Sequence, residues 1–489
     1  MFVFDAAMSL YDFCFSSSFW IFAFTIGNLV LLVGSSLFYA IGWVRRHAAE
    51  PNKKIEPLKN YPMITVVMCC KGVHADSYKN YCRNLSMDYP GPVEFIFVIE
   101  STNDPAWECA ERAIKNAHFA SSNHTARITN AGVSYHNAQK IHNMLHGVAC
   151  SDPQSEYVLF ADDDVFFYSG LIEELLTPLV DEPNKILVST GYEFCVPDKN
   201  AGLGTYALFV YRIQNLLSFI TPRPVLCWGG CWFAPLRLFK ENFFNLVDCY
   251  LDGGYSDDTI ISTLVQKYGY VCSHPYKATF PTQPDPNMAV KKYYDFIKRQ
   301  MFVLVTYSSS YNKRVCHSLA FLIVATVWVM VIWIYLIPFA SILAFLSLFS
   351  SQLHFTPQFF LGLIGGPLWV YLEYAVYNST KIMLKNANSV RPAQEQITFH
   401  FNPINFYAGF VIHFTSMSVS LIQNFIKPSI VWAGVTYHVK NGKIFSVERK
   451  DKEGKKLTEQ FAQSVSRAVK KEEFKTLLPG LKIAERMRK

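Results

Sequence analysis

Long uncharged runs lie on either side of a central region in which short apolar runs alternate with polar ones. The first, residues 19–44, contains 26 residues, enough for a helix to cross about 30 Å of hydrocarbon. Two arginines and a histidine follow at residues 45–47, and by the positive-inside rule they place the next residues in the cytosol. We therefore expect residues 1–50 to form a retained transmembrane anchor. A cleaved signal peptide is the alternative, but the run is too long and no positive segment precedes it.

Residues 51–286 show the pattern of an α/β domain. The runs MITVVMCC, VEFIFVI, YVLFAD and KILVSTGY are apolar almost throughout, which predicts strands covered on both faces. Helix-like stretches such as AWECAERAIKNAH and LIEELLTPLV alternate with them and favour a mainly parallel, mixed sheet. Ligands of such sheets bind beyond the carboxyl ends of the strands. The chemistry is therefore expected at that edge.

After this domain the chain is predicted to return to a membrane. Residues 287–314 mix Lys, Arg and Tyr with apolar positions, as interfacial helices do. Residues 315–428 contain the remaining apolar runs and are expected to be the C-terminal transmembrane region. Residues 429–489 are rich in lysine and are expected to form a basic cytosolic tail.

The number of crossings in the transmembrane region stays open. The uncharged run 318–349 is long for one span, and Pro338 either divides it into a hairpin or kinks it. Further spans are expected at about 358–377 and 405–426. A cytosolic tail requires an even number of crossings after the α/β domain. Three or four segments can be counted, so an odd one would be re-entrant or interfacial.

Composition narrows the class of protein. Hydrophobic residues make up 51% and aromatic residues 16%, which is high for a soluble chain and agrees with membrane segments. The net charge is +7, with much of the excess after Lys440, which suits a surface facing anionic lipid better than nucleic-acid binding. The twelve cysteines follow neither metal nor disulfide spacing, so we expect reduced thiols.

Three consecutive carboxylates end the apolar run in FADDDVF. Because side chains alternate along a strand, Asp162 and Asp164 point to one side and Asp163 to the other. Mg²⁺ and Mn²⁺ prefer oxygen ligands and usually bind through one or two carboxylates and substrate phosphates. Asp162 and Asp164 are thus candidate metal ligands; the alternative is a solvated Asp-rich turn.

A second acidic pair lies in DGGYSDDTI. Asp257 and Asp258 open a predicted helix, where an Asp often serves only as a cap. A carboxylate beside another carboxylate can also have a raised pKa, which suits a general base. Both interpretations stay open on the sequence alone.

Two more polar positions are candidates for donor contacts. Glu100 ends a strand-like run in FVIESTNDPA, and Asp104 follows before a proline; such a loop holds a nucleotide or is an Asp-Pro turn. Lys140 in QKIHNML is a cation for a diphosphate or a surface lysine.

A Gly-rich aromatic segment, CWGGCWF, is a candidate for acceptor contacts. Gly229 and Gly230 stand beside Trp228 and allow close approach of a sugar or a lipid headgroup. The alternative is a packed turn.

Taken together, these motifs follow a known order. An acidic loop, a lysine, an Asp-x-Asp, a Gly-rich aromatic loop, paired acids and an interfacial segment with Gln resemble membrane-bound family 2-like glycosyltransferases with a GT-A fold. The segments VVMCCKGVH, EFIFVIESTNDPA, YVLFADDDV, DGGYSDDTI and GVTYHVKNGKIFSVERKD are most similar to the ceramide glucosyltransferase family, glycosyltransferase family 21, of the plant and algal type. The likeness covers about residues 60–310 and returns at about 430–451.

The resemblance implies a role for each matched residue of the donor site. Glu100 and Asp104 would contact the uridine, and Lys140 would contact the nucleotide sugar. Asp162 and Asp164 would hold Mg²⁺ or Mn²⁺ on the diphosphate.

The resemblance also departs from the family at one motif. Gln300 would open the family's Gln-x-x-Arg-Trp motif, but residues 303–304 are Val and Leu. Arg299, Lys298 or Trp432 would have to take the place of the missing arginine.

The function implied by the resemblance is an inverting transfer of glucose from UDP-glucose to the primary hydroxyl of ceramide, giving β-glucosylceramide. Asp258 would be the base, with Asp257 beside it, and the enzyme would lie in the Golgi or endoplasmic reticulum with its catalytic domain facing the cytosol. The alternatives are a polysaccharide synthase, a polyprenyl-phosphate sugar transferase, or a transporter or receptor that binds a cation without turnover. The expected spans carry few ionisable groups, among them Glu373 and His413, which is thin lining for a polysaccharide or ion path.

Overall fold

The computed structural model of the protein describes residues 58–219, 223–275, 277–325, 357–389, 396–450 and 456–457. The predicted anchor at residues 19–44 lies outside them, as does most of the uncharged run at 318–349. The chain divides into two compact units, Met1–Pro51 with Leu322–Met383 and Asn52–Phe321 with Leu384–Lys489. The described part of the first unit consists of residues 322–325 and most of helix α13 (Pro357–Asn388). The second unit contains the sheets and the candidate site.

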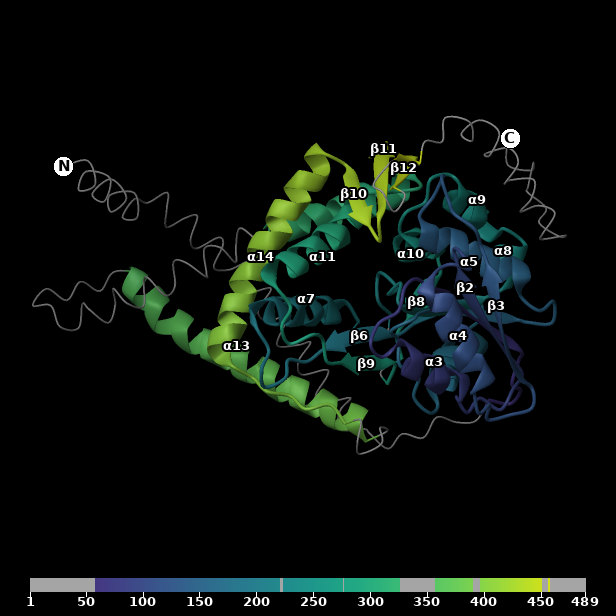
Figure 1. The fold of residues 1–489 in the computed structure, drawn as a ribbon. Helices are drawn as coiled ribbons and strands as arrows, with labels where there is room; N and C mark the ends of the chain where they lie inside the picture. The colour runs from purple at the N-terminus through teal and green to yellow at the C-terminus, as the bar shows by residue number, and fades with distance from the viewer. Residues whose placement is uncertain are drawn as a thin grey trace, which may run out of the picture. The chain divides into compact units, whose positions relative to one another are not determined.

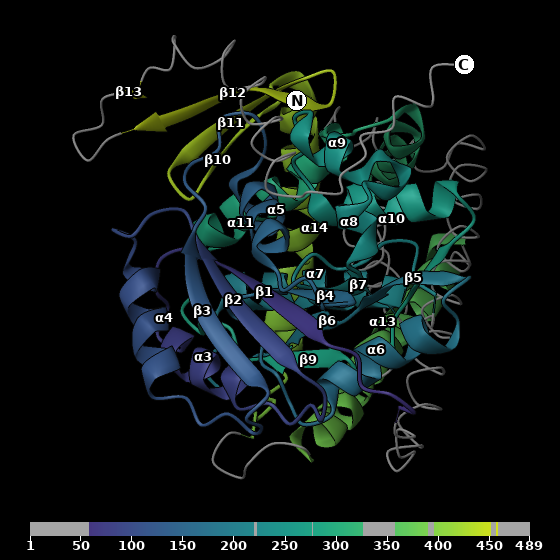
Figure 2. The same cartoon turned by 90° about the vertical axis from the view of Figure 1, so that its right-hand side faces the viewer.

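A seven-stranded sheet forms the centre of the second unit (Figures 1 and 2). Its order is β3-β2-β1-β4-β7-β5-β8. The strands are β1 (Ile64–Cys70), β2 (Val93–Ile99), β3 (His124–Asn130), β4 (Tyr157–Asp162), β5 (Ile186–Thr190), β7 (Cys231–Pro235) and β8 (Val271–Ser273). All neighbours are parallel except β7, which is antiparallel to β4 and to β5. The mixed, mainly parallel α/β sheet predicted from the sequence is therefore confirmed.

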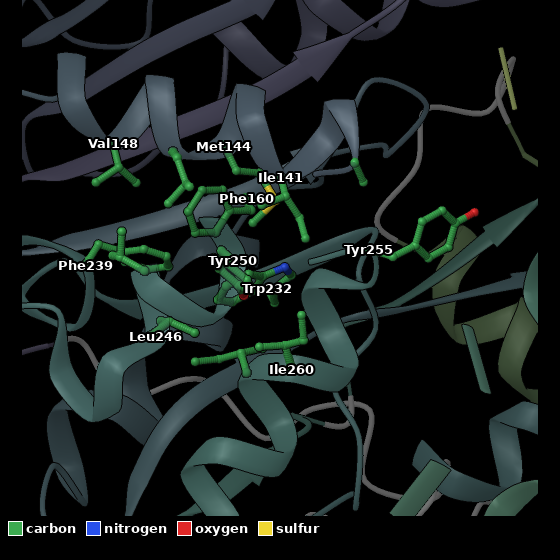
Figure 3. Close-up of a cluster of buried hydrophobic side chains, with 14 of the residues drawn as sticks. Ile141, Met144, Val148, Phe160, Trp232, Phe239, Leu246, Tyr250, Tyr255 and Ile260 are labelled. Carbon is green, nitrogen blue, oxygen red and sulfur yellow. The ribbon is translucent and has the colours of Figure 1, made fainter. Parts of the chain in front are cut away.

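Helices cover both faces of this sheet. Alternate residues of its central strands are therefore buried on opposite sides. Val67 packs in a cluster with α5 and α10, whereas Val66 packs in a cluster with α3, α4 and α6. Figure 3 shows the first cluster, where Ile141 and Met144 of α5 lie above Phe160 and Trp232. The helices of the two layers are α3 (Ser77–Leu85), α4 (Pro105–Lys115), α5 (Gln139–Cys150), α6 (Leu171–Asp181), α8 (Arg237–Lys240), η1 (Phe243–Asn245), α9 (Leu246–Leu251) and α10 (Asp257–Lys267).

A helical layer lies beside a small two-stranded sheet, β6 (Tyr192–Cys195) with β9 (Thr279–Thr282). Helices α7 (Leu203–Phe219), α11 (Val290–Phe302) and α14 (Pro403–Ile426) pack against one another (Figure 1), and η2 (Val303–Val305) continues α11. Buried polar contacts join them.

Two hydrogen bonds of His413 tie the three helices together. Its Nδ1 lies 2.6 Å from the hydroxyl of Tyr293 on α11, and its Nε2 contacts the amide oxygen of Gln214 on α7 at 2.5 Å. The predicted span at 405–426 is thus a helix with one face buried on the α/β unit. Among the described residues, α14 is the one helix long and apolar enough to cross a membrane, and half of its most apolar window is buried. The core helix of a soluble protein has the same character.

A four-stranded antiparallel sheet follows α14: β10 (Ser429–Trp432), β11 (Val435–Lys440), β12 (Lys443–Lys450) and β13 (Lys456–Leu457). Here the structure differs from the predicted basic tail at 429–489, because the segment to Lys450 is folded. Tyr437 and Ile444 are 1% exposed and belong to the core. Asn441 and Gly442 have positive φ angles of 52° and 78°, as a two-residue hairpin turn requires.

Candidate active site at the carboxyl edge of the sheet

Three neighbouring parallel strands bring polar residues to one edge of the central sheet. Strand β1 ends at Cys70, β2 at Ile99 and β4 at Asp162, and their pairing aligns these ends. Lys71 and Glu100 follow directly after β1 and β2. The edge predicted to carry the chemistry is therefore lined by charged groups from at least three strands.

Lys140, in the first turn of α5, joins two of the predicted acidic motifs. Its Nζ lies 2.8 Å from Asp162 Oδ1 and 3.7 Å from Asp257 Oδ2, and it donates to the carbonyl oxygen of Gly229 at 2.7 Å. Burial disfavours its charge, but attraction from the two carboxylates outweighs burial and raises the pKa of Lys140 above its ordinary value. Lys140 therefore remains a cation between the metal motif and the paired acids.

Asp162 and Asp163 face different partners, although strand β4 ends at Asp162 and the next two aspartates lie in a turn. Asp162 faces Lys140, whereas Asp163 accepts a hydrogen bond from the Tyr81 hydroxyl at 3.4 Å. Burial, and then repulsion from Asp162, raises the pKa of Asp163 to about 7. Surrounding protein, and then repulsion from Glu193, raises the pKa of Asp164 to about 7, although its side chain still reaches solvent.

Asp257 is held on the buried side of the site. It is 6% exposed, and its Oδ2 accepts a hydrogen bond from Trp232 Nε1 at 3.2 Å. Burial raises the pKa of Asp257 to about 6, and the opposing charges of Lys140 and Asp258 act on it in addition. Its carboxylate therefore contacts Trp232 and Lys140 on the inner side of the site.

Asp258 has one oxygen fixed and one directed at the glycine loop. Its Oδ1 accepts from the Thr259 amide at 2.7 Å and from the Ser256 hydroxyl. A Cβ placed on Gly229 would lie 3.2 Å from Asp258 Oδ2 and 3.4 Å from each oxygen of Asp257. The structure thus brings the paired acids and the glycine loop together.

The glycine loop is shaped by its aromatic neighbours. A Cβ on Gly230 would lie 2.2 Å from the ring of Trp228, so only glycine fits at this position. The Trp228 ring packs against Tyr192 and Phe280, with centroids 5.9 and 6.0 Å away. The acceptor role of Trp228, Gly229 and Gly230 stays a prediction.

The first acidic loop is already engaged by protein groups. The Glu100 carboxylate pairs with Lys71 and lies 3.4 Å from Arg449 Nη1. Asp104 caps α4, because its Oδ1 accepts from the amides of Ala106 at 2.9 Å and Gly72 at 2.8 Å. Their predicted contact with uridine stays untested.

Gln300 and Arg299 of α11 contact aromatic residues of neighbouring elements. Gln300 accepts a hydrogen bond from the Tyr211 hydroxyl at 3.3 Å. The pKa of Tyr211 is raised chiefly by burial, and the charges of Asp258 and Arg299 both act on it. The Arg299 guanidinium lies over the Trp432 ring at 5.2 Å, so two of the three predicted substitutes for the missing arginine are in contact.

Sequence analysis missed several residues of this edge. Lys71 and Trp232 stand inside quoted motifs, but their contacts with Glu100 and Asp257 cannot be read from the sequence. Arg449 stands inside the quoted segment GVTYHVKNGKIFSVERKD, but this segment was assigned to a tail. The contact of Arg449 with Glu100 joins positions 349 residues apart.

Two carboxylates of the acidic run remain accessible from solvent. Asp162 has a side chain that is 37% exposed, and Asp164 is exposed. The described residues contain no group of three or more Asp, Glu, His or Cys arranged to hold a metal alone. Mg²⁺ commonly takes only one or two carboxylates and completes its shell with phosphates and water, so this donor set suits a metal that arrives with a diphosphate.

Known proteins similar to this chain are glycosyltransferases. Residues 26–205 match glycosyl transferase family 21, which confirms the resemblance predicted from the motifs. A mannosyltransferase from Pyrobaculum calidifontis, solved with GDP-Man and Mn²⁺, is 14% identical, with a TM-score of 0.40, and the match covers 76% of this chain and 99% of that one. Glucosyl-3-phosphoglycerate synthase from Mycobacterium tuberculosis is 13% identical, with a TM-score of 0.30, covering 52% and 79%. No curated protein matches the chain.

Proposed function

From the match of residues 26–205 to glycosyl transferase family 21, we propose that the protein transfers glucose from UDP-glucose to the primary hydroxyl of ceramide, with inversion at the anomeric carbon. The observation that carries the transfer chemistry is Lys140, which holds Asp162 and Asp257 on one edge of the sheet. The choice of donor sugar and of ceramide rests on the resemblance.

Asp162 and Asp164 would hold Mg²⁺ or Mn²⁺ against the donor diphosphate. When bound, such an ion neutralises charge that develops on the departing UDP. Lys140 adds a fixed positive charge beside Asp162.

Asp258 is the proposed general base. Its Oδ1 is held by the Thr259 amide and the Ser256 hydroxyl, which orients the carboxylate and leaves Oδ2 free to take a proton. As the acceptor oxygen forms its bond to C1 of the sugar, the bond from C1 to the diphosphate breaks and the hydroxyl proton passes to Asp258 Oδ2. One displacement inverts C1, so an α-linked donor gives a β-glucoside.

Asp257 is a poorer candidate for the base. Its Oδ2 is bonded to Trp232, its charge is paired with Lys140, and it is 6% exposed. We assign Asp257 to holding Lys140 and Trp232 around the reacting centre.

The acceptor would come from a bilayer of the Golgi or endoplasmic reticulum, with the α/β unit on the cytosolic side. Helix α14 has exposed apolar residues along one stripe, namely Val419, Ile422 and Ile426. The polar residues of α11 lie beside this helix, as in an interfacial segment. The alternative acceptors are a polyprenyl phosphate and a growing polysaccharide.

The test is a transfer assay with the full-length protein in detergent. We expect UDP release and glucosylceramide, identified by mass spectrometry, from UDP-glucose, ceramide and Mn²⁺. Asp258→Asn should lose transfer by about 10²-fold or more while still binding UDP. Transfer to a polyprenyl phosphate but not to ceramide would show that the acceptor is a polyprenyl phosphate. Full activity of Asp258→Asn would show that Asp258 is not the general base.

A further inference from the structure

Arg449 of strand β12 is a charged residue that is only 7% exposed. Its guanidinium lies 3.4 Å from Glu100 and 3.4 Å from the Ser134 carbonyl, and it donates a close hydrogen bond to Gln139 Oε1. A buried charge is costly unless it is paired. Arg449 is therefore fixed by these partners, and it fixes them in return.

Gln139 connects this arginine to the centre of the site. It is the first residue of α5 and directly precedes Lys140. The residue before it, Ala138, has no side chain to cap the helix, and the Tyr437 hydroxyl of β11 instead accepts from the Gln139 amide at 3.3 Å. The start of α5 is thus capped by the C-terminal sheet.

The same sheet also touches the loop that precedes the paired acids. The Ile444 amide donates to the Gly253 carbonyl at 2.9 Å, and Lys443 pairs with Asp252. Gly253 has a φ of +75°, and a Cβ there would lie 2.7 Å from the Ile444 carbonyl oxygen. Only glycine allows this approach.

The two loops contact each other as well. The Ala138 amide donates to the Gly254 carbonyl at 2.9 Å, and the Asn137 side chain donates to the Tyr250 carbonyl at 3.2 Å. The sheet therefore touches the loop before Lys140 and the loop before Asp257, and the Ala138–Gly254 hydrogen bond joins these two loops.

We propose that the C-terminal sheet β10–β12 is a structural part of the donor site. In this proposal Arg449 and Tyr437 are positioning residues: they hold Gln139 and thereby fix the position of Lys140. This inference rests on the proposed glycosyl transfer. Glu100, with Lys71 and Arg449 on either side, anchors the sheet to the edge. The sheet aligns the donor-side cation with the carboxylates rather than touching the acceptor.

The test compares three variants of the full-length protein in detergent: Arg449→Gln, Tyr437→Phe and Lys440→Gln. Lys440 is an exposed charge of the same sheet and serves as the matched control. We expect Arg449→Gln to raise the KM for the nucleotide sugar about 10-fold or more and Tyr437→Phe about 3-fold. Both should leave the acceptor KM within 2-fold, and Lys440→Gln should match the wild type. Arg449→Lys should raise the donor KM less than Arg449→Gln does, because lysine keeps the positive charge and loses only the second hydrogen bond.

Thermal unfolding shows whether each variant is folded, and if Arg449→Gln is not, Tyr437→Phe decides the question. A folded variant with wild-type donor KM overturns the proposal, as does a rise confined to the acceptor KM. If the wild type transfers no sugar at all, the proposed function fails instead, and UDP binding to the same variants, measured by calorimetry, still tests the positioning role. Unchanged UDP affinity in both variants then overturns it.

Discussion

Replacing Lys140 with glutamine removes the cation that joins the metal motif to the paired acids. With an effective dielectric of about 20, Coulomb's law gives about 6 kcal/mol for the 2.8 Å contact with Asp162 and about 4.5 kcal/mol for the 3.7 Å contact with Asp257. Water screens the first contact, because the Asp162 side chain is 37% exposed. Breaking a buried pair typically costs about 3–5 kcal/mol, because the remaining charge is left uncompensated. We expect Lys140→Gln to lose about 3 kcal/mol of unfolding free energy.

Lys185 provides a matched control. It lies 2.8 Å from Glu182, the same separation as Lys140 from Asp162, but both side chains of this pair are nearly half exposed. Exposed pairs contribute about 0–1 kcal/mol, so Lys185→Gln should change stability little. Denaturant unfolding of the two variants in detergent measures the difference.

A second substitution distinguishes lost charge compensation from lost packing. In the Lys140→Gln background, Asp257→Asn removes the buried charge that Lys140 compensated and should recover part of the lost stability. If Lys140→Gln is no less stable than Lys185→Gln, or if Asp257→Asn gives no recovery, Lys140 does not hold the paired acids and the electrostatic account of the site is refuted.

Three further predictions concern packing, pH and the helical layer. Gly229→Ala places a methyl group 3.2 Å from Asp258 Oδ2 and should lower the transfer rate at least 10-fold with a small change in melting temperature; an unchanged rate would contradict the close approach. Burial lowers the pKa of His274 from 6.5 to about 4, so the unfolded chain binds a proton at a higher pH than the folded chain does. The free energy of unfolding is therefore unaffected by this residue above pH 6.5 and falls by up to about 3 kcal/mol as the pH drops toward 4. Unfolding at several pH values should show this slope, and His274→Asn should flatten it. His413→Phe removes two of the hydrogen bonds that join α14 to α7 and α11 and should cost about 2–4 kcal/mol, whereas equal thermal stability would show that these two bonds do not hold α14 in place.

The strands of the central sheet could be predicted where their burial is two-sided. VEFIFVI coincides with β2, and YVLFAD coincides with β4. The run KILVSTGY was one predicted strand but forms β5 and the start of β6. Gly191 separates them, and a Cβ there would lie 2.2 Å from the Phe280 ring, a contact that no local pattern reveals.

Three strands of the central sheet, β3, β7 and β8, were not predicted, and for β3 and β7 the local sequence carries the wrong signal. β3 has the polar sequence HTARITN, since it lies at the sheet edge and pairs only with β2. β7 begins inside the segment predicted as a Gly-rich loop, and all five of its residues are buried. Its antiparallel pairing with β4 and β5 is long-range, and sequence alone does not fix it.

The C-terminal sheet was missed for a different reason, because net charge was given more weight than alternation. In β11 the residues Val435, Tyr437 and Val439 are buried and their neighbours are not, which is the period-2 pattern of a strand with one face in the core. The Asn441–Gly442 turn after it is a strong hairpin signal. The lysines of this segment lie on the other face or at the ends, so a positive segment and a folded sheet are compatible.

The acidic run that marked the site is tolerated because each carboxylate has its own environment. Lys140 neutralises Asp162, and solvent reaches Asp164. Asp163 accepts a hydrogen bond from the Tyr81 hydroxyl, and burial raises its pKa to about 7, which lowers its average charge near neutral pH. The sequence led us to expect that a bound Mg²⁺ or Mn²⁺ would offset the repulsion among these carboxylates. The structure has a cation within the protein, Lys140, whose ammonium group contacts Asp162, Asp257 and the Gly229 carbonyl. The accessible oxygens of the run therefore remain available to an ion that comes with its substrate, which is the division of charge that a transient diphosphate site requires.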